Sequence, residues 1–350
     1  MRDFNYRIIK ETRWDSEILG LIAAIYKEAG KQELYLKQRP EELEKLVEIA
    51  KIQSTETSNE IEGIITTDSR IRRLVEGKTV PKNRSEQEIA GYRDVLSIIH
   101  ESFDAIPITQ NYILQLHKIL YAHTNNPLAG HTKNVQNYIS VTYPDGHAKT
   151  LFTPLAPHET PVALDRICEE YNLVIGNMEL EPLIAIPVFI HDFLCIHPFN
   201  DGNGRMSRLL TTLLLYRSGF YVGKYISLEA KIAKNKDLYY DALRASQVGW
   251  HEGNDDPIPF IKYLLGTILA AYRDFEDRFA LVETKRSALD IVRLAAQMKI
   301  GSFTKQDMRE LCPSLSLSSV EGALRKLTES GELRKEGRGK NTHYYRTESQ

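Results

Sequence analysis

Hydrophobic positions recur three and four residues apart along most of the chain, with charged residues between them. This spacing places the apolar side chains on one face of an α-helix. Helices are therefore predicted over residues 15–29, 40–62, 85–101, 109–121, 160–176, 182–196, 203–218, 236–247 and 257–281. A repeat of fixed period is not visible, so the pattern predicts a mainly α protein and argues against a solenoid.

One segment departs from the helical spacing. The sequence NYISVTYPDGHAKTLFTP, residues 137–154, alternates weakly and is rich in β-branched and aromatic residues. Pro144, Asp145 and Gly146 at its centre are typical of a tight turn. The segment is predicted to form a β-hairpin. A lone hairpin in a helical domain is more often a flap or a partner-binding edge than a core element.

The C-terminal part predicts a separate domain. Three helical segments, TKRSALDIVRLAAQM, FTKQDMRELCP and LSLSSVEGALRKLTESGEL, are followed by the Gly-rich basic segment RKEGRGKNTHYYR, which is expected to form a hairpin. This is the element order of a winged helix-turn-helix. The predicted domains are an N-terminal helical region at 1–84, a helical core at 85–281 and a winged helix at 284–350.

Composition and charge separate the tail from the rest. The chain has 350 residues, of which 42% are hydrophobic and 26% charged, as in an ordinary globular protein. The net charge of −2 does not suit a molecule built as a whole for nucleic acid or for a membrane surface. Residues 284–350, however, contain 13 basic and 8 acidic residues and carry a net charge of +5. This asymmetry predicts an anionic partner for the tail alone.

DNA is one candidate for that partner. Ser316 is a plausible N-cap for the recognition helix, whose first turn would face the bases. The basic residues suited to phosphate contacts are Arg325, Lys326, Arg334, Lys335, Arg338 and Lys340. The alternative is a winged helix that binds a protein or forms a homodimer, because the recognition helix is poor in the residues that read bases.

The cysteines and the most apolar stretch of the chain indicate the cellular compartment of the protein. Cys168, Cys195 and Cys312 have no paired spacing and are interpreted as reduced thiols of a cytoplasmic protein. The chain opens on a polar segment rather than on a secretory signal. The most apolar stretch, PLIAIPVFIHDFLCI, is too short to span a bilayer, so no membrane partner is expected.

The segment HPFNDGNGRMSR, residues 197–208, has the composition of an anion-binding helix start. A helix N-terminus offers unpaired backbone N–H groups and the positive end of the helix dipole. Gly202 and Gly204 allow phosphate oxygens to approach the backbone. Arg205 and Arg208, three residues apart on the same helix, can form paired hydrogen bonds with phosphate oxygens.

Three further residues of this segment suggest the chemistry. Asp201 offers a hard oxygen ligand for the Mg²⁺ that a polyphosphate brings with it. His197 can accept a proton at neutral pH, and Phe199 is expected to anchor the loop from beneath. A nucleotide, a metal and a base at one place predict phosphoryl or nucleotidyl transfer.

The same segment resembles the complete signature of the Fic family, His-x-Phe-x-Asp/Glu-Gly-Asn-Gly-Arg-x-x-Arg. The resemblance implies a helical core with a β-hairpin flap, and transfer of AMP from ATP to a hydroxyl side chain of a target protein. It implies that His197 deprotonates the hydroxyl, that Asp201 holds Mg²⁺, and that Arg205 and Arg208 hold the β- and γ-phosphates. The implied nucleotide-binding set is Phe199, Gly202, Asn203, Gly204, Arg205 and Arg208.

A second segment, SNEIEG, resembles the inhibitory motif of the same family. Ser58 and Glu62 are four residues apart and share one helix face, and Gly63 is a natural residue to end the helix. The resemblance implies that Glu62 pairs with Arg208 and takes the place of the γ-phosphate. Some family members use this glutamate to remove AMP, so a bifunctional enzyme is an open alternative.

The remaining candidates are weaker. Tyr239 and Tyr240 lie where family members often line the adenine pocket, although aromatic residues at helical spacing are as often core. Lys133 stands where the family usually has arginine, and it is assigned no role. A rival hypothesis is a DNA-binding regulator whose core senses nucleotide without catalysis. The target protein, which can include the chain itself, is not encoded in any recognisable motif.

Overall fold

The computed structural model describes residues 2–38, 40–142, 148–282, 287–299, 301–312, 315–337 and 342–347. The prediction of a mainly α fold is confirmed. The chain divides into two compact units, one formed by residues 1–29 and 50–271 and the other by residues 30–49 and 272–350. The domain boundaries predicted at 84 and 284 stay predictions.

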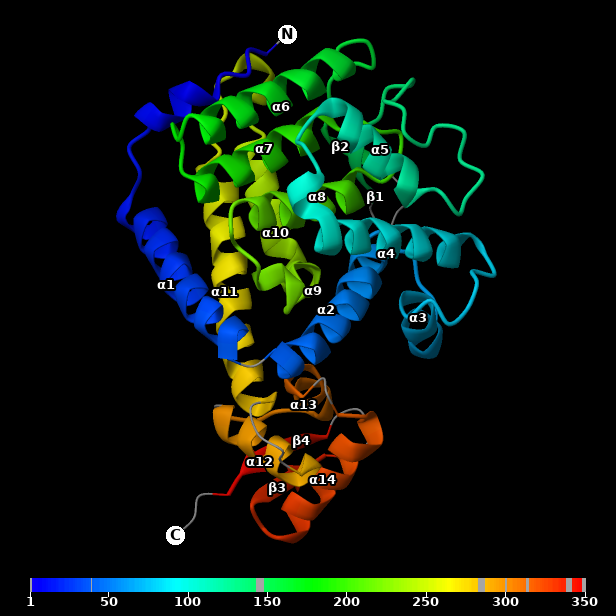
Figure 1. The fold of residues 1–350 in the computed structure, drawn as a ribbon, viewed down its shortest axis with the longest axis vertical. Coiled ribbons are helices and arrows are strands. Elements are labelled where there is room, and N and C mark those ends of the chain that lie inside the picture. Colours follow the sequence, from blue (N-terminus) through cyan, green and yellow to red (C-terminus); the bar gives the residue numbers. More distant parts are fainter. Residues whose placement is uncertain are drawn as a thin grey trace. The chain divides into compact units, whose positions relative to one another are not determined.

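Most helices belong to the first unit (Figure 1). These are α3 (Asp68–Val75), α4 (Arg84–Ser102), α5 (Gln110–Leu120), α6 (Thr160–Gly176), α7 (Pro182–Ile196), α8 (Asn203–Arg217), α9 (Leu228–Lys234) and α10 (Lys236–Ser246). Short 3-10 turns lie at η1 (Tyr6–Glu11), η2 (Phe103–Ala105), η3 (Val222–Lys224) and η4 (Trp250–Glu252). The helices with residues in both units are α1 (Ser16–Gln38), α2 (Pro40–Ile61) and α11 (Ile258–Val282).

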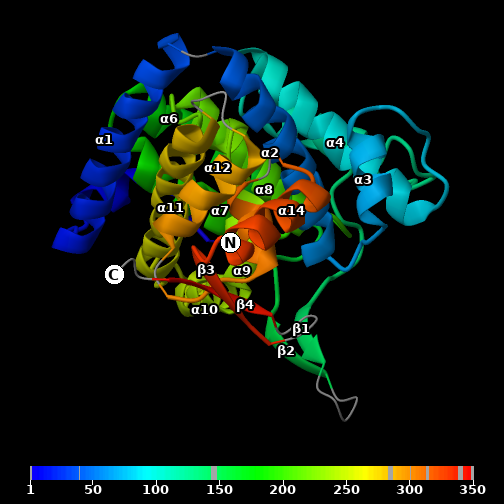
Figure 2. The same ribbon diagram turned by 90° about the horizontal axis from the view of Figure 1, so that it is seen from below.

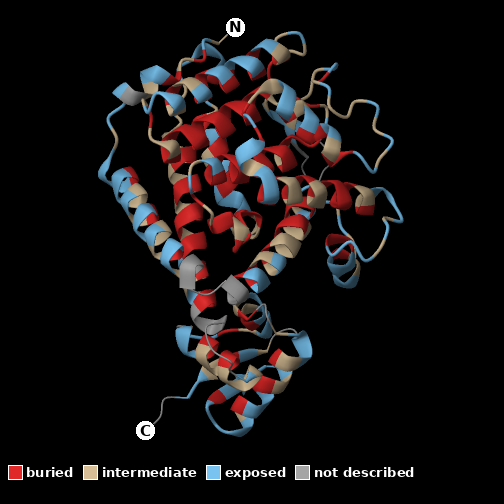
Figure 3. Ribbon diagram, viewed as in Figure 1, coloured by how far each residue is buried: buried red, intermediate tan, exposed pale blue. Residues whose placement is uncertain are grey.

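The core of the first unit is built on α7 and α8. Helix α7 is apolar on all sides, so it can only be stable where other helices surround it. It packs against α6 and α8, and its side chains from Leu183 to Ile196 are buried. Figure 3 shows α7 and α8 buried along nearly their whole length. The turn between these two helices is therefore held by the most rigid part of the unit.

Helix α1 differs from its predicted range, because it continues to Gln38 instead of ending at residue 29. Gly30 does not end it, since a glycine inside a helix costs only about 1 kcal/mol. Packing of the added turns offsets this cost: the ring of Tyr35 lies 4.4 Å from that of Phe279 in the second unit. The short helices α3 and α9 were not predicted, because seven or eight residues give too little periodicity.

The predicted hairpin is present. Strands β1 (Ile139–Thr142) and β2 (Ala148–Phe152) are antiparallel, with Ile139 opposite Phe152 and Thr142 opposite Ala148. In Figure 2 the two strands project from the helices of the first unit. The turn predicted at Pro144–Gly146 lies outside the described residues.

The second unit contains the predicted order of three helices and a hairpin. Its elements are α12 (Ala288–Met298), α13 (Lys305–Leu311), α14 (Leu317–Glu329), β3 (Leu333–Glu336) and β4 (His343–Arg346). Thr304 and Asp307 form a capping box at α13, and Ser316 caps α14 as expected. The buried core of this C-terminal module includes Val292 and Leu324. The predicted wing residues Arg338 and Lys340 lie outside the described residues.

Candidate active site

The turn between α7 and α8 brings a histidine and a helix start together. Helix α7 ends at Ile196 and is followed by its C-cap residue His197, whose backbone is left-handed with φ of 52° and whose N–H donates to the carbonyl of Phe193 at 2.9 Å. Gly202, with φ of 85°, stands immediately before α8 and takes a conformation that glycine adopts without strain. Left-handed backbone at a residue other than glycine costs about 1–2 kcal/mol. His197 is therefore held there by its surroundings.

Asn203 and Phe199 close this turn from inside. The Asn203 side chain accepts a hydrogen bond from the Phe199 N–H at 2.9 Å and donates one to the Phe199 carbonyl at 2.7 Å. The ring of Phe199 is fully buried and stacks on His117 at 3.7 Å. Both side chains were expected in the nucleotide-binding set. In the described conformation both side chains fix the shape of the loop, and their part in nucleotide binding stays a prediction.

The first turn of α8 is an uncapped helix start. Gly202 has no side chain to cap it, so the first N–H groups of the helix, at Asn203, Gly204 and Arg205, have no side-chain partner from the N-cap. A Cβ atom on Gly204 would collide with the carboxylate of Glu62. A carboxylate therefore lies directly against the helix start, where the dipole and the N–H groups favour an anion.

His197 is available as a base. Its Nδ1 lies 3.3 Å from the carbonyl oxygen of Leu194, so this nitrogen carries the proton and Nε2 keeps a lone pair. Burial lowers the pKa of His197 to about 4, although the bond to Leu194 opposes this change. The imidazole is therefore neutral at physiological pH and can accept a proton.

Asp201 is the exposed carboxylate of the site. Its side chain is 59% exposed, and its Oδ1 accepts a hydrogen bond from the Gly202 N–H at 2.7 Å. A cluster of three or more His, Cys, Asp or Glu side chains that could hold a metal does not occur among the described residues. Asp201 thus offers one carboxylate, which fits Mg²⁺ only where a polyphosphate supplies further oxygens.

Arg208 pairs with the end of helix α2. Its Nη2 donates to Glu62 Oε1 at 2.8 Å and to the Ser58 carbonyl at 2.9 Å, and its Nε donates to Ser58 Oγ at 2.8 Å. Burial lowers the pKa of Arg208, but the charge of Glu62, its hydrogen bond and the nearby tyrosines together outweigh burial, so the net shift of this pKa is upward. The structure thus places the segment 58–63 against Arg208, the second arginine of the segment 197–208.

The end of α2 presents Glu62 by a standard helix ending. Gly63 has φ of 76°, its N–H donates to the Glu60 carbonyl, and the Ile64 N–H donates to the Asn59 carbonyl, both at 2.9 Å. These two bonds form a Schellman motif, which needs a left-handed residue where Gly63 stands. Glu62 is therefore the last residue before the chain turns away, and its side chain is 36% exposed.

Arg205 has a different environment from the expected one. It is buried, its Nη1 lies 2.8 Å from Glu88 Oε2, and its Nη2 donates to the Tyr121 hydroxyl at 2.7 Å. Its guanidinium group also lies over the Tyr121 ring, 5.3 Å from the centroid. An arginine bound in this way does not reach out to solvent as a phosphate ligand would. Helix α4, which supplies Glu88, holds it instead.

The two tyrosines of α10, Tyr239 and Tyr240, lie near the end of α2 that carries Glu62. Tyr239 is buried, and burial raises the pKa of its hydroxyl, while the charge of Arg208 acts in the opposite direction. Tyr240 is 43% exposed and lies beside Lys236, whose Nζ donates to the carbonyl of Ile61 at the end of α2. The charges of Arg208 and Glu62 therefore act on the pKa of both hydroxyl groups. Tyr240 is accessible to solvent, whereas Tyr239 is packed inside.

Four supporting residues of the site were given no role from the sequence. Glu88 and Tyr121 hold Arg205, while His117 accepts from the Gly130 N–H at 3.0 Å and contacts the Asp201 carbonyl at 3.1 Å. Lys133 is buried and contacts the loop that holds His197. Their partners lie tens of residues away in the chain, so only the fold brings them together.

The family model of Fic/DOC proteins matches residues 107–215. This segment is therefore similar to a Fic domain. The match includes the whole turn from His197 to Arg208, the hairpin, and helices α5 to α7 with most of α8. Ser58 and Glu62 lie outside it, as does the C-terminal module.

Curated relatives with similar sequences bear adenylyltransferase names. The protein adenylyltransferase fic-1 of Caenorhabditis elegans is 26% identical over 196 residues, which is 55% of this chain and 33% of the relative. The protein adenylyltransferase Fic of Nematostella vectensis is 29% identical over 171 residues, or 47% of this chain and 37% of the relative. The chain therefore matches about a third of the length of these relatives.

Solved structures share the fold. A Fic family protein from Desulfovibrio desulfuricans aligns over 97% of this chain and 98% of its own, with a TM-score of 0.60 and 19% identity. A Fic domain containing signaling protein from Bacteroides thetaiotaomicron aligns over 74% of this chain and 96% of its own, with a TM-score of 0.58 and 22% identity. The first alignment includes the elements on both sides of the Fic domain.

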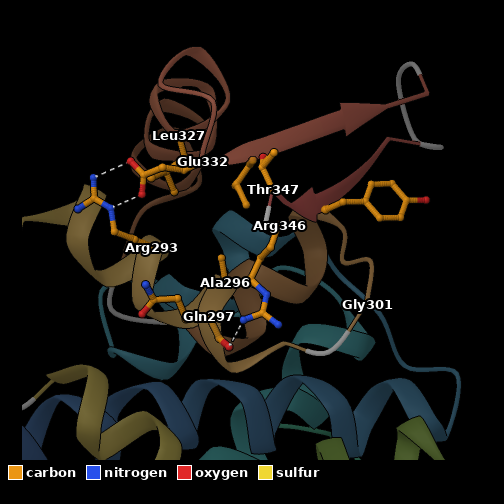
Figure 4. A pocket seen from close by; sticks show the side chains of 10 residues that line it. Arg293, Ala296, Gln297, Gly301, Leu327, Glu332, Arg346 and Thr347 are labelled. Carbon is orange, nitrogen blue, oxygen red and sulfur yellow. Dashed lines mark hydrogen bonds and ion pairs between the residues drawn. The ribbon is translucent and has the colours of Figure 1, made fainter. Parts of the chain in front are cut away.

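The C-terminal module has a pocket of its own, away from the Fic motif in sequence. Figure 4 shows it between α12 and the hairpin, with a volume of about 530 Å³. Arg293 is bound to Glu332 there through two hydrogen bonds of 2.6 and 3.1 Å, and Arg346 donates to the carbonyl of Gln297. Both arginines thus have partners within the module, so the pocket indicates no ligand.

Proposed function

We propose that the chain is a self-inhibited protein adenylyltransferase that transfers AMP from ATP to a hydroxyl side chain of a target protein. The observation that carries this proposal is the uncapped start of α8, with a neutral imidazole at one end and the Glu62 carboxylate resting on it. An anion already occupies the place that phosphates would need. The adenylyltransferase names of the relatives support the choice of AMP.

The proposed reaction uses the residues of the turn in a simple order. The N–H groups at the start of α8 bind phosphate oxygens of ATP, and Nε2 of His197 accepts the proton of the target hydroxyl. The hydroxyl oxygen then forms a bond to the α-phosphorus, and the bond from that phosphorus to the bridging oxygen breaks. Pyrophosphate leaves with the bonding electrons, and the AMP group stays on the target.

Two residues of the motif bind the polyphosphate chain. Asp201 would hold Mg²⁺, which when bound neutralises charge on the phosphate oxygens. Arg208 is suited to the terminal phosphate because its guanidinium group already holds an anion of similar charge. Arg205 supports the loop in the described conformation, and a phosphate contact would require it to leave Glu88.

Glu62 is the proposed inhibitor, because it competes with ATP for Arg208 and for the helix start. Hydrogen bonds to charged groups contribute about 1.5–3 kcal/mol. Release of Glu62 should therefore change the population of the competent state about 10- to 150-fold. Ser58 assists by holding the same guanidinium group through its hydroxyl and its carbonyl.

Incubation with Mg²⁺ and ATP labelled in the α-phosphate tests the proposal. Wild type should label itself or an added target weakly, Glu62→Gly should label strongly, and Glu62→Gly/His197→Ala should not label. Mass spectrometry should find AMP on a Ser, Thr or Tyr hydroxyl. Equal labelling and equal ATP affinity in wild type and Glu62→Gly would contradict inhibition by Glu62. Absence of AMP from the product in Glu62→Gly would contradict the activity.

Removal of AMP by Glu62 is an alternative outcome of the same design. The Glu62 carboxylate is partly exposed next to His197, so it can also orient a water molecule. Protein labelled with Glu62→Gly enzyme should then lose AMP when wild type is added, and keep it when Glu62→Gly is added. No loss with wild type would leave transfer as the only activity.

A second candidate function is DNA binding by the C-terminal module. A groove of about 890 Å³ lies between α13, α14 and the hairpin, and its basic side chains are Lys305, Arg309, Arg325 and Lys335. Glu321 and Glu329 line it too, and Lys305 lies 2.6 Å from Glu321, which weakens the field. The test is whether the protein shifts the electrophoretic mobility of duplex DNA. A shift that weakens with salt would support DNA binding if it is lost in Arg325→Ala/Lys335→Ala and kept in Lys118→Ala. No shift at low salt would contradict it.

Location in the cytoplasm is proposed from the three cysteines, which are buried and free. In the part of the chain that the structure describes, none of the helices combines the length and the apolarity that crossing a membrane requires.

A further inference from the structure

The segment that leads into strand β1 runs alongside the turn that carries His197. The side chains of Asn134 and Asn200 bind each other at 2.8 Å, and the Asn134 N–H donates to Asn200 Oδ1 at 3.2 Å. The Lys133 N–H donates to the Pro198 carbonyl at 2.8 Å. Backbone and side chains of this segment therefore bind a loop that lies more than sixty residues further along the chain.

Lys133 is the buried member of this segment. Its side chain is only 3% exposed, and its Nζ donates to the carbonyl of Ile196 at 2.9 Å and to Asn137 Oδ1 at 3.0 Å. Ile196 is the last residue of α7, so its carbonyl is one that the helix itself leaves unpaired. Burying an ammonium group is costly unless its hydrogen bonds are satisfied, and these two bonds explain why it is tolerated here.

Asn137 continues the contacts. Its Nδ2 donates to the Phe199 carbonyl at 3.0 Å and lies 3.5 Å from the His197 carbonyl. Together with Lys133 it contacts the carbonyl groups of four consecutive residues, which are Ile196, His197, Pro198 and Phe199. The contacts to these carbonyl groups fix the peptide planes on both sides of His197. The left-handed backbone of His197 needs such support.

We propose that Lys133 and Asn137 are positioning residues for His197. They hold the peptide planes around that residue, and thereby the direction in which its imidazole points. Neither touches the reacting atoms. The inference rests on the proposed function, because it assigns these residues to the base of that reaction.

The charge of Lys133 has a second consequence. The groups that act on the pKa of His197, besides its burial and its bond to Leu194, are Lys133, Glu62 and Asp201. Lys133 lowers this pKa, and the two carboxylates raise it. The ammonium group of Lys133 therefore helps to keep the imidazole unprotonated, so that it stays a base. Asn137 carries no charge and should act through geometry alone.

The test compares Lys133→Met, Lys133→Arg and Asn137→Ala in the Glu62→Gly background. Misplacement of a catalytic group by about 1 Å can cost about 100-fold, so Lys133→Met and Asn137→Ala should lower kcat for AMP transfer by about 10- to 100-fold. The KM for ATP should stay unchanged, because neither residue contacts the start of α8. Lys133→Arg, which keeps the charge and the donors, should restore most of the rate. Lys118→Met, an exposed lysine of α5, serves as the control.

NMR titration of the His197 imidazole provides a readout that does not need activity. Its pKa should rise in Lys133→Met and stay in place in Asn137→Ala and Lys133→Arg. The proposal would be overturned if Lys133→Met and Asn137→Ala both kept the kcat of the Glu62→Gly protein in which they are made. If Glu62→Gly does not label at all, the proposed function fails, and unchanged His197 resonances in both variants would overturn the positioning role independently. Should Lys133→Met not fold, Asn137→Ala decides: a lowered kcat with shifted His197 resonances supports the proposal, and parental values of both overturn it.

Discussion

Arg205 and Arg208 of α8 lie one turn apart and each pairs with a carboxylate from another helix, but the two regions around them differ. Arg205 binds Glu88 in a closed environment, where the Glu88 side chain is 6% exposed and Tyr121 completes the contacts. Arg208 binds Glu62, whose side chain is 36% exposed and stands at the very end of α2. One pair belongs to the core, and the other lies at its edge.

The difference teaches which pair can open. Separation of Arg205 from Glu88 would leave the buried guanidinium group of Arg205 without this carboxylate, although Glu88 would keep its bond to Arg84, so this pair should stay closed. Separation of Arg208 from Glu62 needs only a movement of the last turn of α2, and Glu62 is already partly in solvent. We therefore expect the first pair to stabilise the fold and the second to control access to the helix start.

The largest effect is expected from Glu88→Leu. Removal of one partner of a buried ion pair leaves Arg205 uncompensated and should lower the free energy of unfolding by about 3–5 kcal/mol. Urea denaturation measures this. Glu62→Leu, the matched change at the partly exposed pair, should cost less, about 1.5–3 kcal/mol, because the last turn of α2 can let water reach Arg208. Equal losses in the two variants would contradict the distinction between the pairs.

The next effect concerns activity. Glu62→Gly should raise the initial rate of AMP transfer about 10- to 150-fold, in line with the loss of about 1.5–3 kcal/mol of competing interaction. Glu88→Leu should not raise it, because the Arg205 pair does not cover the helix start. The rate is measured with labelled ATP at saturating Mg²⁺. A rise in Glu88→Leu as large as that in Glu62→Gly would show that both pairs inhibit.

Ser58→Ala should have an intermediate effect. The variant removes the 2.8 Å bond between Ser58 Oγ and Arg208 Nε but keeps the bond to the Ser58 carbonyl. Loss of about 1 kcal/mol should raise the transfer rate about fivefold without removing the inhibitor. Ser54→Ala, a buried serine one turn earlier in α2, is the control. A rate equal to that of wild type would exclude Ser58 from the switch.

Gly63→Ala should have a smaller effect. A side chain at φ of 76° costs about 1 kcal/mol, which should loosen the helix ending that presents Glu62. The transfer rate is expected to rise two- to fivefold, about as much as this strain allows. Gly77→Ala imposes the same strain at φ of 68° but follows α3 instead, so it should destabilise the protein without changing the rate. A rise in both variants would point to general loosening.

The smallest change is expected from pH. Because burial lowers the pKa of His197 to about 4, the base stays unprotonated well below the ordinary histidine range. The transfer rate of Glu62→Gly should therefore be nearly constant from pH 8 to pH 6 and should fall only as the pH approaches 4. A rate profile with an acid limb near pH 6.5 would show that His197 is not the buried base described above.

Much of the site could be predicted from sequence, because its chemistry lies in two short segments. Glycines, arginines and a histidine within 197–208 indicate an anion site, and the helix end at Ser58–Gly63 is visible in the residue types. The resemblance to the Fic family supplied the link between Glu62 and Arg208, and the structure adds Ser58 to that contact. Local patterns predict local structure well because neighbours in sequence determine it.

The supporting residues could not be predicted, because they are contacts between distant segments. Glu88 reads as one charged position in a helix, and nothing in its neighbourhood indicates that it meets Arg205. The burial of Arg205 could not be predicted either, because residue type alone does not reveal it, and its expected contact with the β-phosphate stays a prediction. Lys133 was assigned no role, since its bond to the Ile196 carbonyl exists only once the end of α7 has folded against it.

The central claim is that the start of α8 binds the phosphates of ATP once Glu62 is removed. A crystal of the Glu62→Gly/His197→Ala variant soaked with Mg²⁺ and ATP tests it most directly, because this variant cannot turn the substrate over. The account predicts phosphate oxygens on the N–H groups of residues 203–205 and a terminal phosphate on Arg208. An empty helix start in that crystal, with ATP bound elsewhere or not at all, would contradict it.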